Sequence, residues 1–557
     1  MHTAFIHHSF YPFMQTIARN KVQMFAYILN GHIDSCRLIW WRRGNIQEKH
    51  AVQMVRLHES DNRSQWVCEV CWESEIHYLK YYFEMTDQEN RTVFADEYGL
   101  SENMGTEQTA FELLQTHSED IVCVPKWAKG CVFYQIYPDS FSLPPEASES
   151  DKANWSSKPD KDHFLGGTLR GIRSRIPYLK ELGVDCLYLT PIFQADFTHR
   201  YATTDYIKID PRLGTEQDLI DLTEALHENG IRIILDGVFN HCGVHFSQFE
   251  DVLVNGENSQ YKDWFHIKKY PVTVDPSCYE CVGDYPFMPR LNGDCPEVRE
   301  YVKSVLLYWL NTAHIDGWRF DVADELDENA VRYWRESDRR DFPEALMIAE
   351  TWHQGTLIAD GGSHFDCAMN YLFRSAVLDY FAHDTIDGNT FISRIEDMLM
   401  CYPEGVNDAM YNLIGSHDTT RFLTECGDEK WRLKMAAAFQ LLFRGSPAIY
   451  YGDEIGMDGE NDPGCRAGTT WDQMDSDLLD CVKNLISIRK THSAVLYGKC
   501  CVSLLNNECL VLERTLDSDR VTAVFNKKSY SIFLDSADAA GKVDVPARSV
   551  KIIFSTL

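Results

Sequence analysis

The stretch Gly317-Trp318-Arg319-Phe320-Asp321 is a short apolar run that ends in a carboxylate. Two other runs share this pattern, Met347-Ile348-Ala349-Glu350 and Ile233-Ile234-Leu235-Asp236. An acid at the end of a buried strand costs free energy unless it is paired or takes part in chemistry. Strands that repeatedly end in acids are typical of a (β/α)8 barrel, because the chemistry of that fold lies at the carboxyl ends of its strands.

The region from residue 126 to 494 alternates apolar strands with amphipathic helices, which predicts βα units around a parallel sheet. We expect the catalytic barrel in this region. An interruption from about residue 242 to 292 is too long for an ordinary connection, so it predicts an inserted subdomain. The clearest expected elements are the strands 186–190 and 231–235 and the helices 217–228 and 298–310.

Residues 1–125 and 495–557 contain short segments rich in β-branched and aromatic residues, separated by polar turns. Strands at this spacing predict an N-terminal β-sandwich and a smaller C-terminal β-domain. The sequence therefore predicts an α/β protein, a (β/α)8 TIM barrel between two all-β domains. The expected strands are 24–29, 36–41, 51–57, 65–72 and 78–85, followed near the C-terminus by 508–514, 521–525 and 550–554.

Composition narrows the classes of function. The chain has 557 residues and a net charge of −31, which disfavours binding to nucleic acid or to anionic membranes. It shows neither a long apolar run nor a basic, apolar leader, so we expect a cytoplasmic protein. The eighteen cysteines are then expected to be reduced. There are two CxxC pairs, Cys68/Cys71 and Cys278/Cys281. The two pairs are too far from each other in the sequence for the spacing of a zinc site.

Two carboxyl groups have sequence neighbours that suit opposite roles. Arg319 and Asp321 are two residues apart on one strand, so their side chains face the same way and the guanidinium can keep Asp321 ionised. Glu350 follows an apolar strand with no adjacent basic residue, which favours a protonated acid. The two carboxyl groups are therefore expected to differ in their protonation state.

Together with Ser416-His417-Asp418 and the segment 236–241, these fragments resemble, in order, the signature regions of the alpha-amylase family, glycoside hydrolase family 13. The resemblance implies that Asp321 is the nucleophile, Glu350 the general acid and base, and Asp418 the third catalytic carboxylate. It also implies a set of substrate-binding residues, namely Tyr201, Asp236, His241, Met288, Arg319, Glu325, Trp352, His417 and Arg421.

Two further segments are similar to the neopullulanase, cyclomaltodextrinase and maltogenic amylase subgroup. They are Met288-Pro289-Arg290-Leu291-Asn292 and Glu350-Thr351-Trp352-His353. This similarity implies hydrolysis of α-1,4 bonds in cyclomaltodextrins, maltooligosaccharides or pullulan, with transglycosylation through the same covalent intermediate. It also implies a homodimer in which the N-terminal β-domain covers part of the partner's site.

The chain departs from the subgroup at a few positions near the expected site. Asp324 stands where the subgroup usually has the asparagine of Val-Ala-Asn-Glu, and Ala202 stands where an aspartate is common after the stacking tyrosine. Thr168 stands where the family often has an aspartate of a calcium loop, and a hard cation needs several oxygen ligands. We therefore expect no structural calcium there and no required cofactor.

Two alternatives remain open from the sequence. The first is an α-glucosidase or a glucan transferase of the same family, because these classes differ mainly in their loops. The second is a catalytically inactive glucan-binding subunit, although all three catalytic acids are present. The expected partners are an α-glucan substrate and a second copy of the chain.

Overall fold

The computed structural model describes residues 4–31, 33–118, 120–160, 162–505, 509–535 and 542–556. The chain forms two compact units. The first comprises residues 1–124, 359–363 and 389–407, and the second comprises residues 125–358, 364–388 and 408–557. Within the described ranges, no helix is long and apolar enough to cross a membrane.

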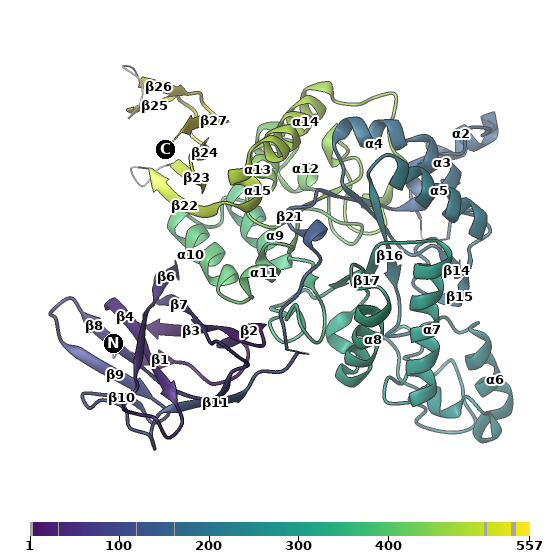
Figure 1. Cartoon of the computed structure of the whole chain (residues 1–557). Coiled ribbons are helices and arrows are strands. Elements are labelled where there is room, and N and C mark those ends of the chain that lie inside the picture. Colours follow the sequence, from purple (N-terminus) through teal and green to yellow (C-terminus); the bar gives the residue numbers. More distant parts are fainter. Residues whose placement is uncertain are drawn as a thin grey trace. The chain divides into compact units, whose positions relative to one another are not determined.

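The first unit contains two antiparallel sheets (Figure 1). Its strands are β1 (Ala4–Ile6), β2 (Met14–Ala18), β3 (Lys21–Leu29), β4 (Ile33–Arg42), β5 (His50–Gln53), β6 (Val55–Glu59), β7 (Arg63–Cys71), β8 (His77–Asp87), β9 (Thr92–Asp96), β10 (Gly99–Ser101) and β11 (Phe111–Gln115). One sheet has the order β1-β3-β7-β6 with β2 on β3, and the other has the order β10-β9-β8-β4-β5 with β11 on β8. Met24 and Trp66 of the first sheet share a buried core with Leu38 and Phe83 of the second. The predicted β-sandwich is confirmed.

The segment 51–57, which the sequence predicts to be one strand, is two strands in different sheets. Strand β5 pairs with β4, whereas β6 pairs with β7. Met54 lies between them, is 2% exposed, and donates its amide to the Cys36 carbonyl at 2.9 Å. The single-strand prediction is wrong because the chain crosses from one sheet to the other at a position that no glycine or proline marks.

Residues 389–407 belong to the first unit although they lie in the barrel part of the sequence. They include most of helix α10 (Gly388–Leu399) and helix α11 (Glu404–Asn407). An ion pair between Arg63 Nε and Asp397 Oδ1, at 2.8 Å, ties strand β7 to α10. The compact unit therefore combines distant segments of the chain, which a boundary drawn from composition does not reveal.

The second unit is built on an eight-stranded sheet in which neighbouring strands are parallel. Its strands are β12 (Phe133–Ile136), β13 (Cys186–Leu189), β16 (Arg232–Gly237), β17 (Gly317–Phe320), β18 (Leu346–Ala349), β19 (Cys367–Ala368), β20 (Tyr411–Leu413) and β21 (Ser446–Tyr450). The order is β19-β18-β17-β16-β13-β12-β21-β20, and a parallel bridge between Met369 and Tyr411 joins the two edges. This closure makes the predicted barrel.

Helices connect the barrel strands, and Figure 1 shows α5, α7 and α8 outside strands β16 and β17. Helix α5 begins at a capping box, in which Thr215 and Asp218 each bind the other's backbone amide. The main helices of this unit are α3 (Leu169–Ser174), α4 (Ile176–Leu182), α5 (Glu216–Glu228), α7 (Pro296–Thr312), α8 (Glu328–Asp341), α9 (Tyr371–Val377), α13 (Lys430–Leu442), α14 (Ser476–Thr491) and α15 (Ser493–Tyr497).

Gly317 begins β17 because strand β18 passes very close to it. Gly317 has a φ of +154°, and a Cβ at this position would lie 2.2 Å from the Leu346 carbonyl oxygen. Any side chain would push β18 away from β17 and would move Glu350 with it. The glycine is therefore required by the spacing of the two strands that carry the predicted acids.

Two additions to the barrel carry residues of the expected site. The hairpin of β14 (Phe193–Ala195) and β15 (Thr203–Ile209) holds Tyr201 in its connection, and the sequence pattern does not predict it. The stretch after β16 contains helix α6 (Ser247–Asn255) and returns to the barrel through an antiparallel bridge between His241 and Arg290.

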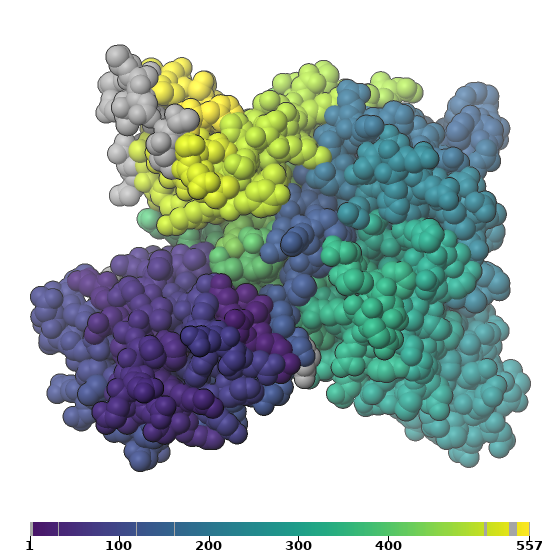
Figure 2. All heavy atoms as spheres, viewed as in Figure 1, coloured from purple at the N-terminus to yellow at the C-terminus, as the bar shows by residue number. Residues whose placement is uncertain are grey.

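The C-terminal strands form an antiparallel sheet β22-β23-β24-β27 and a separate pair β25-β26. They are β22 (Lys499–Leu505), β23 (Cys509–Leu516), β24 (Asp519–Asn526), β25 (Ile532–Asp535), β26 (Lys542–Val545) and β27 (Ser549–Thr556). Buried Arg514, on β23, donates to the Leu442 carbonyl at 3.1 Å at the end of α13. In Figure 2 the yellow atoms of this sheet are continuous with the yellow-green helices beside them.

Candidate active site

Three carboxylates from neighbouring barrel strands meet around one guanidinium. Asp236 lies in β16, Asp321 follows β17 and Glu350 follows β18. Arg319 Nη1 donates to Asp236 Oδ1 at 2.8 Å and to Asp321 Oδ1 at 2.9 Å. Arg319 Nη2 makes an ion pair with Glu350 Oε1 at 2.8 Å. The structure thus brings together the acids that the sequence places at separate strand ends.

Burial has the largest effect on the pKa values of Asp321 and Asp236. Burial raises the pKa of Asp321 well above its usual value; Arg319 lowers it, and the charges of Glu350 and Asp236 raise it. Burial also raises the pKa of Asp236 to about 6, against the effect of Arg319. Arg319 lowers the pKa of Asp321, as the sequence predicts, but burial and the two neighbouring acids outweigh this effect.

Backbone geometry in the loop after β17 holds Glu350 in place. The Glu350 carboxylate accepts a hydrogen bond from the Val322 amide at 2.9 Å and another from Trp352 Nε1 at 3.3 Å. Val322 has a left-handed backbone, with φ 46° and ψ 49°. This conformation is strained for a β-branched residue, and such strain concentrates at functional sites. Here it directs an amide at Glu350.

A chain of hydrogen bonds connects His417 to Asp236. Gln135 Nε2 donates to His417 Nδ1 at 2.6 Å. His417 Nε2 lies 2.5 Å from the Tyr201 hydroxyl, which in turn donates to Asp236 Oδ2 at 3.0 Å. Burial lowers the pKa of His417 well below its usual value, so the ring is neutral. The bond from Gln135 then assigns the ring proton to Nε2, on the side of the site.

Asp418 completes the set of three predicted catalytic acids. Its Oδ2 lies 3.1 Å from His417 Nε2, and its Oδ1 accepts a hydrogen bond from Arg466 Nη2 at 3.1 Å. The Asp418 side chain keeps 27% of its surface exposed. A carboxylate that is held on one side and open on the other can accept hydrogen bonds from ligand hydroxyl groups.

His241 lies near Asp321 with unused hydrogen-bonding capacity. Its Nε2 is 3.9 Å from Asp321 Oδ2, and burial lowers the pKa of His241 to about 3, so the ring is neutral. Among the described residues, neither ring nitrogen has a hydrogen-bond partner of normal geometry. Because a buried polar group without a partner costs free energy, a ligand hydroxyl is a suitable partner.

Aromatic rings border the carboxylates on two sides. The Tyr201 ring stacks on His417 with centroids 5.6 Å apart and an angle of 10° between the planes. Trp352 stacks on Tyr371 at 4.1 Å and 13°, and 46% of Trp352 remains exposed. An indole that is supported from behind and exposed in front is a platform for the apolar face of a sugar.

The remaining predicted substrate-binding residues have different surroundings. Glu325 accepts a hydrogen bond from Asn240 Nδ2 at 3.2 Å and lines a cavity of about 190 Å³. Met288 lies buried in the stretch after β16. Arg421 is completely buried and donates to Asp453 Oδ1 at 2.7 Å. The structure does not support a contact between Arg421 and substrate, because its guanidinium is enclosed by protein.

The sequence did not single out several residues that complete the site. Tyr188 donates to Asp236 Oδ2 at 2.6 Å, and Tyr371 supports Trp352. Gln135 and Arg466 orient His417 and Asp418. An uncharged glutamine or tyrosine in a strand gives no distinguishing signal in the sequence, since such residues are usually part of a core.

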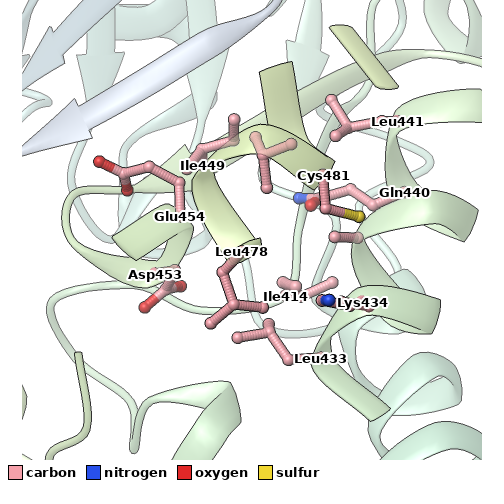
Figure 3. Close-up of a pocket in the computed structure, with 12 residues that line it drawn as sticks. Ile414, Leu433, Lys434, Gln440, Leu441, Ile449, Asp453, Glu454, Leu478 and Cys481 are labelled. Atoms are coloured by element: carbon pink, nitrogen blue, oxygen red, sulfur yellow. The ribbon is translucent and has the colours of Figure 1, made fainter. Parts of the chain in front are cut away.

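A separate apolar pocket lies among β21, α13 and α14 (Figure 3). Leu433, Leu478 and Cys481 line it, and the figure shows the Glu454 carboxylate directed away from these side chains. The cavity volume of about 20 Å³ admits about one water molecule. This pocket is too small for a sugar.

Comparison with known proteins agrees with this geometry. The family model described as the alpha-amylase catalytic domain matches residues 135–480. The cyclomaltodextrinase of Thermoanaerobacter pseudethanolicus (strain ATCC 33223 / 39E) is 40% identical over 432 residues, which cover 77% of this chain and 75% of that protein. Neopullulanase 2 of Thermoactinomyces vulgaris is 35% identical over 546 residues, which cover 96% of this chain and 92% of that protein.

A solved structure of a cyclomaltodextrinase matches this chain with a TM-score of 0.91 and 31% identity, and the match covers 100% of this chain and 99% of that one. The matched family region contains the strand ends that carry Asp236, Asp321 and Glu350, and also His417 and Asp418. The chain therefore belongs to the alpha-amylase family, glycoside hydrolase family 13, and is a glycoside hydrolase.

Proposed function

We propose that this chain is a retaining glycoside hydrolase that cleaves α-1,4-glucosidic bonds of cyclomaltodextrins, maltooligosaccharides or pullulan. One observation carries the proposal: Asp321 and Glu350 contact adjacent nitrogens of the same guanidinium. This arrangement is compatible with the separation of about 5 Å between the two carboxyl groups of retaining enzymes. The names of the relatives, cyclomaltodextrinase and neopullulanase, support the substrate class.

The first step forms a covalent intermediate. Glu350 donates its proton to the glycosidic oxygen while an Asp321 oxygen attacks the anomeric carbon. The bond to the leaving sugar breaks, and an ester bond to Asp321 forms. The active protonation state therefore has its proton on Glu350 and its charge on Asp321.

The second step releases the sugar. The charged Glu350 takes a proton from a water molecule, the water oxygen bonds to the anomeric carbon, and Asp321 leaves as a carboxylate. A sugar hydroxyl in place of water gives transglycosylation. Glu325 lies four residues after Asp321 on the same loop and borders a cavity, which supports binding of an acceptor or leaving sugar there.

Replacing the nucleophile tests the proposal directly. Asp321→Asn keeps the shape of the side chain, but its amide cannot form the glycosyl ester. We expect kcat on cyclomaltodextrin to fall by about 10³-fold or more. Initial-rate measurement on the purified variant checks this.

The matched control for Asp321→Asn is Asp338→Asn. Asp338 is a buried acid on α8 that is 1% exposed, but it belongs to a different cluster, with Arg335 and Asp366. The control is expected to keep kcat within about twofold of the unmodified chain. An Asp321→Asn variant that retains a tenth of the original kcat would rule out the nucleophile assignment.

The raised acid pKa values predict an unusual pH dependence. Asp321 must be ionised to attack, so kcat/KM falls as the pH drops through the raised pKa of the cluster. We expect the acid limb at a higher pH than an ordinary aspartate would give, because burial raises the pKa of Asp321 well above its usual value and the charge of Asp236 raises it further. Asp236→Asn removes a neighbouring negative charge, which should lower the pKa of Asp321 and move the acid limb down by about 0.5 to 1 pH unit.

The control for this shift is again Asp338→Asn. Burial raises the pKa of Asp338 to about 7, but its loss leaves the acids around Arg319 unchanged, so the acid limb should stay in place. The kcat/KM profiles of the three proteins, measured from pH 4 to 8, distinguish these cases. If the acid limb of Asp236→Asn stays at the pH of the unmodified chain, the charge of Asp236 does not raise the pKa of Asp321, and this part of the proposal is wrong.

The residues at the family's calcium loop do not fit a calcium site in this chain. Thr168 Oγ1 accepts the Gly171 amide at 3.0 Å and caps helix α3. Asp139 Oδ2 accepts the Leu165 amide at 2.8 Å. Oxygens that already accept backbone hydrogen bonds, with a hydroxyl in place of one carboxylate, are a poor cage for a hard cation. We therefore propose that activity requires no calcium.

A homodimer and a cytoplasmic location also remain proposals. Exposed large apolar side chains on the first unit support a partner surface; they are Phe10, Val55, Tyr98, Leu100, Met104 and Leu114. Buried thiols such as Cys242 and Cys367 suit a reducing compartment, which cell fractionation tests.

One experiment tests the dimer and the calcium proposal together. Sedimentation in buffer with a chelator should give twice the 64.3 kDa chain mass, and activity should equal that in buffer with calcium. A monomeric mass contradicts the dimer. Activity that is lost in chelator and restored by calcium alone contradicts the calcium proposal.

A further inference from the structure

The loops after β17 and β18 are connected by three hydrogen bonds. Two of them end on Glu350: the Val322 amide donates to its carboxylate at 2.9 Å, and the Ala323 amide donates to its carbonyl at 3.0 Å. The third joins Thr351 Oγ1 to Asp324 Oδ2 at 3.2 Å. Neither Thr351 nor Asp324 takes part in the proposed bond-making and bond-breaking steps.

Thr351 is adjacent in the sequence to two side chains of the site, Glu350 and Trp352. It is 2% exposed. Its single hydroxyl donates to Asp324 and accepts the His353 amide at 3.3 Å. Because a β-branched side chain has few χ1 choices, a hydroxyl that is fixed at both its donor and its acceptor sites fixes the backbone as well.

Asp324 supplies the other half of the contact from the nucleophile's loop. It lies in the 3-10 turn η4 (Ala323–Glu325), directly after the strained Val322. Asp324 itself is exposed, so its second oxygen can stay hydrated while the first accepts from Thr351.

We propose that Thr351 and Asp324 are positioning residues that hold the general acid's loop against the nucleophile's loop. The inference rests on the proposed role of Glu350 as the acid. Without the contact, the backbone that carries Glu350 and Trp352 is freer to move away from the glycosidic oxygen, while Asp321 stays attached to β17. Proton delivery to the leaving group is then impaired more than nucleophilic attack.

This difference between the two steps gives a test: residues that only stabilise the fold would affect both substrates equally. Thr351→Val removes the hydroxyl and keeps the branched shape, and Asp324→Ala removes the acceptor. Each should lower kcat on cyclomaltodextrin by about 3- to 10-fold, as the loss of one hydrogen bond does. Each should change kcat on p-nitrophenyl maltoside by less than about twofold, because a good leaving group needs little protonation.

Conservative variants and a double variant sharpen the result. Thr351→Ser and Asp324→Asn keep a donor and an acceptor, so both should keep kcat on cyclomaltodextrin near the original value. The double variant Thr351→Val with Asp324→Ala should lose no more than either single variant, since both remove the same contact. The matched control is Thr223→Val on α5, which removes a buried hydroxyl that donates to Leu219 O and should change neither substrate's rate.

Glu350→Gln, measured in parallel, separates the two ways in which the inference can fail. If Glu350→Gln lowers kcat equally on cyclomaltodextrin and on the aryl substrate, the assignment of Glu350 as the acid is wrong. A second outcome is that Glu350→Gln keeps its kcat on the aryl substrate. If the Thr351 and Asp324 variants then lose kcat equally on both substrates, or keep full kcat on both, the positioning inference is wrong. Thermal melts of all variants identify any loss that comes from unfolding, and Thr351→Ser and Asp324→Asn then supply the comparison.

Discussion

The site depends on one buried cation, the Arg319 guanidinium. Three acids that are almost fully buried converge on it, and a carboxylate buried this far from water is costly unless a positive charge is paired with it. The barrel fixes this arrangement through its register, because Asp236 lies opposite Arg319 in the ladder between β16 and β17. Gly317 then lets β18 approach closely enough for Glu350 to reach the same guanidinium.

The same constraint explains why the surrounding loops are strained and polar. Val322 adopts a left-handed backbone so that its amide reaches Glu350, and the contact between Thr351 and Asp324 continues that connection. On the opposite side, neutral His417 and Tyr201 carry hydrogen bonds back to Asp236. The cluster is therefore enclosed by groups that orient its oxygens without adding further charge beside Asp321.

The sequence predicts the parts of this arrangement that follow from the spacing of apolar residues and from the positions of charged residues. An acid at the end of an apolar run marks a strand end, so the sequence alone predicts Asp236, Asp321 and Glu350 as residues of the site. The crossover at Met54 and the hairpin that carries Tyr201 depend on tertiary pairing, which leaves no local signal. The resemblance predicts that Arg421 binds substrate, but the structure shows that its guanidinium is buried and donates to Asp453. The raised pKa of Asp321 likewise depends on burial and on neighbours from other strands.

The central claim is that Asp321 and Glu350 act as nucleophile and acid on one sugar, which requires two inversions at the anomeric carbon. Proton NMR during the first minutes of cyclomaltodextrin hydrolysis reads the configuration of the new reducing end before it mutarotates. The account predicts that the α-anomer appears first. Initial release of the β-anomer would show a single displacement by water and would contradict the assignment of Asp321 as a covalent nucleophile.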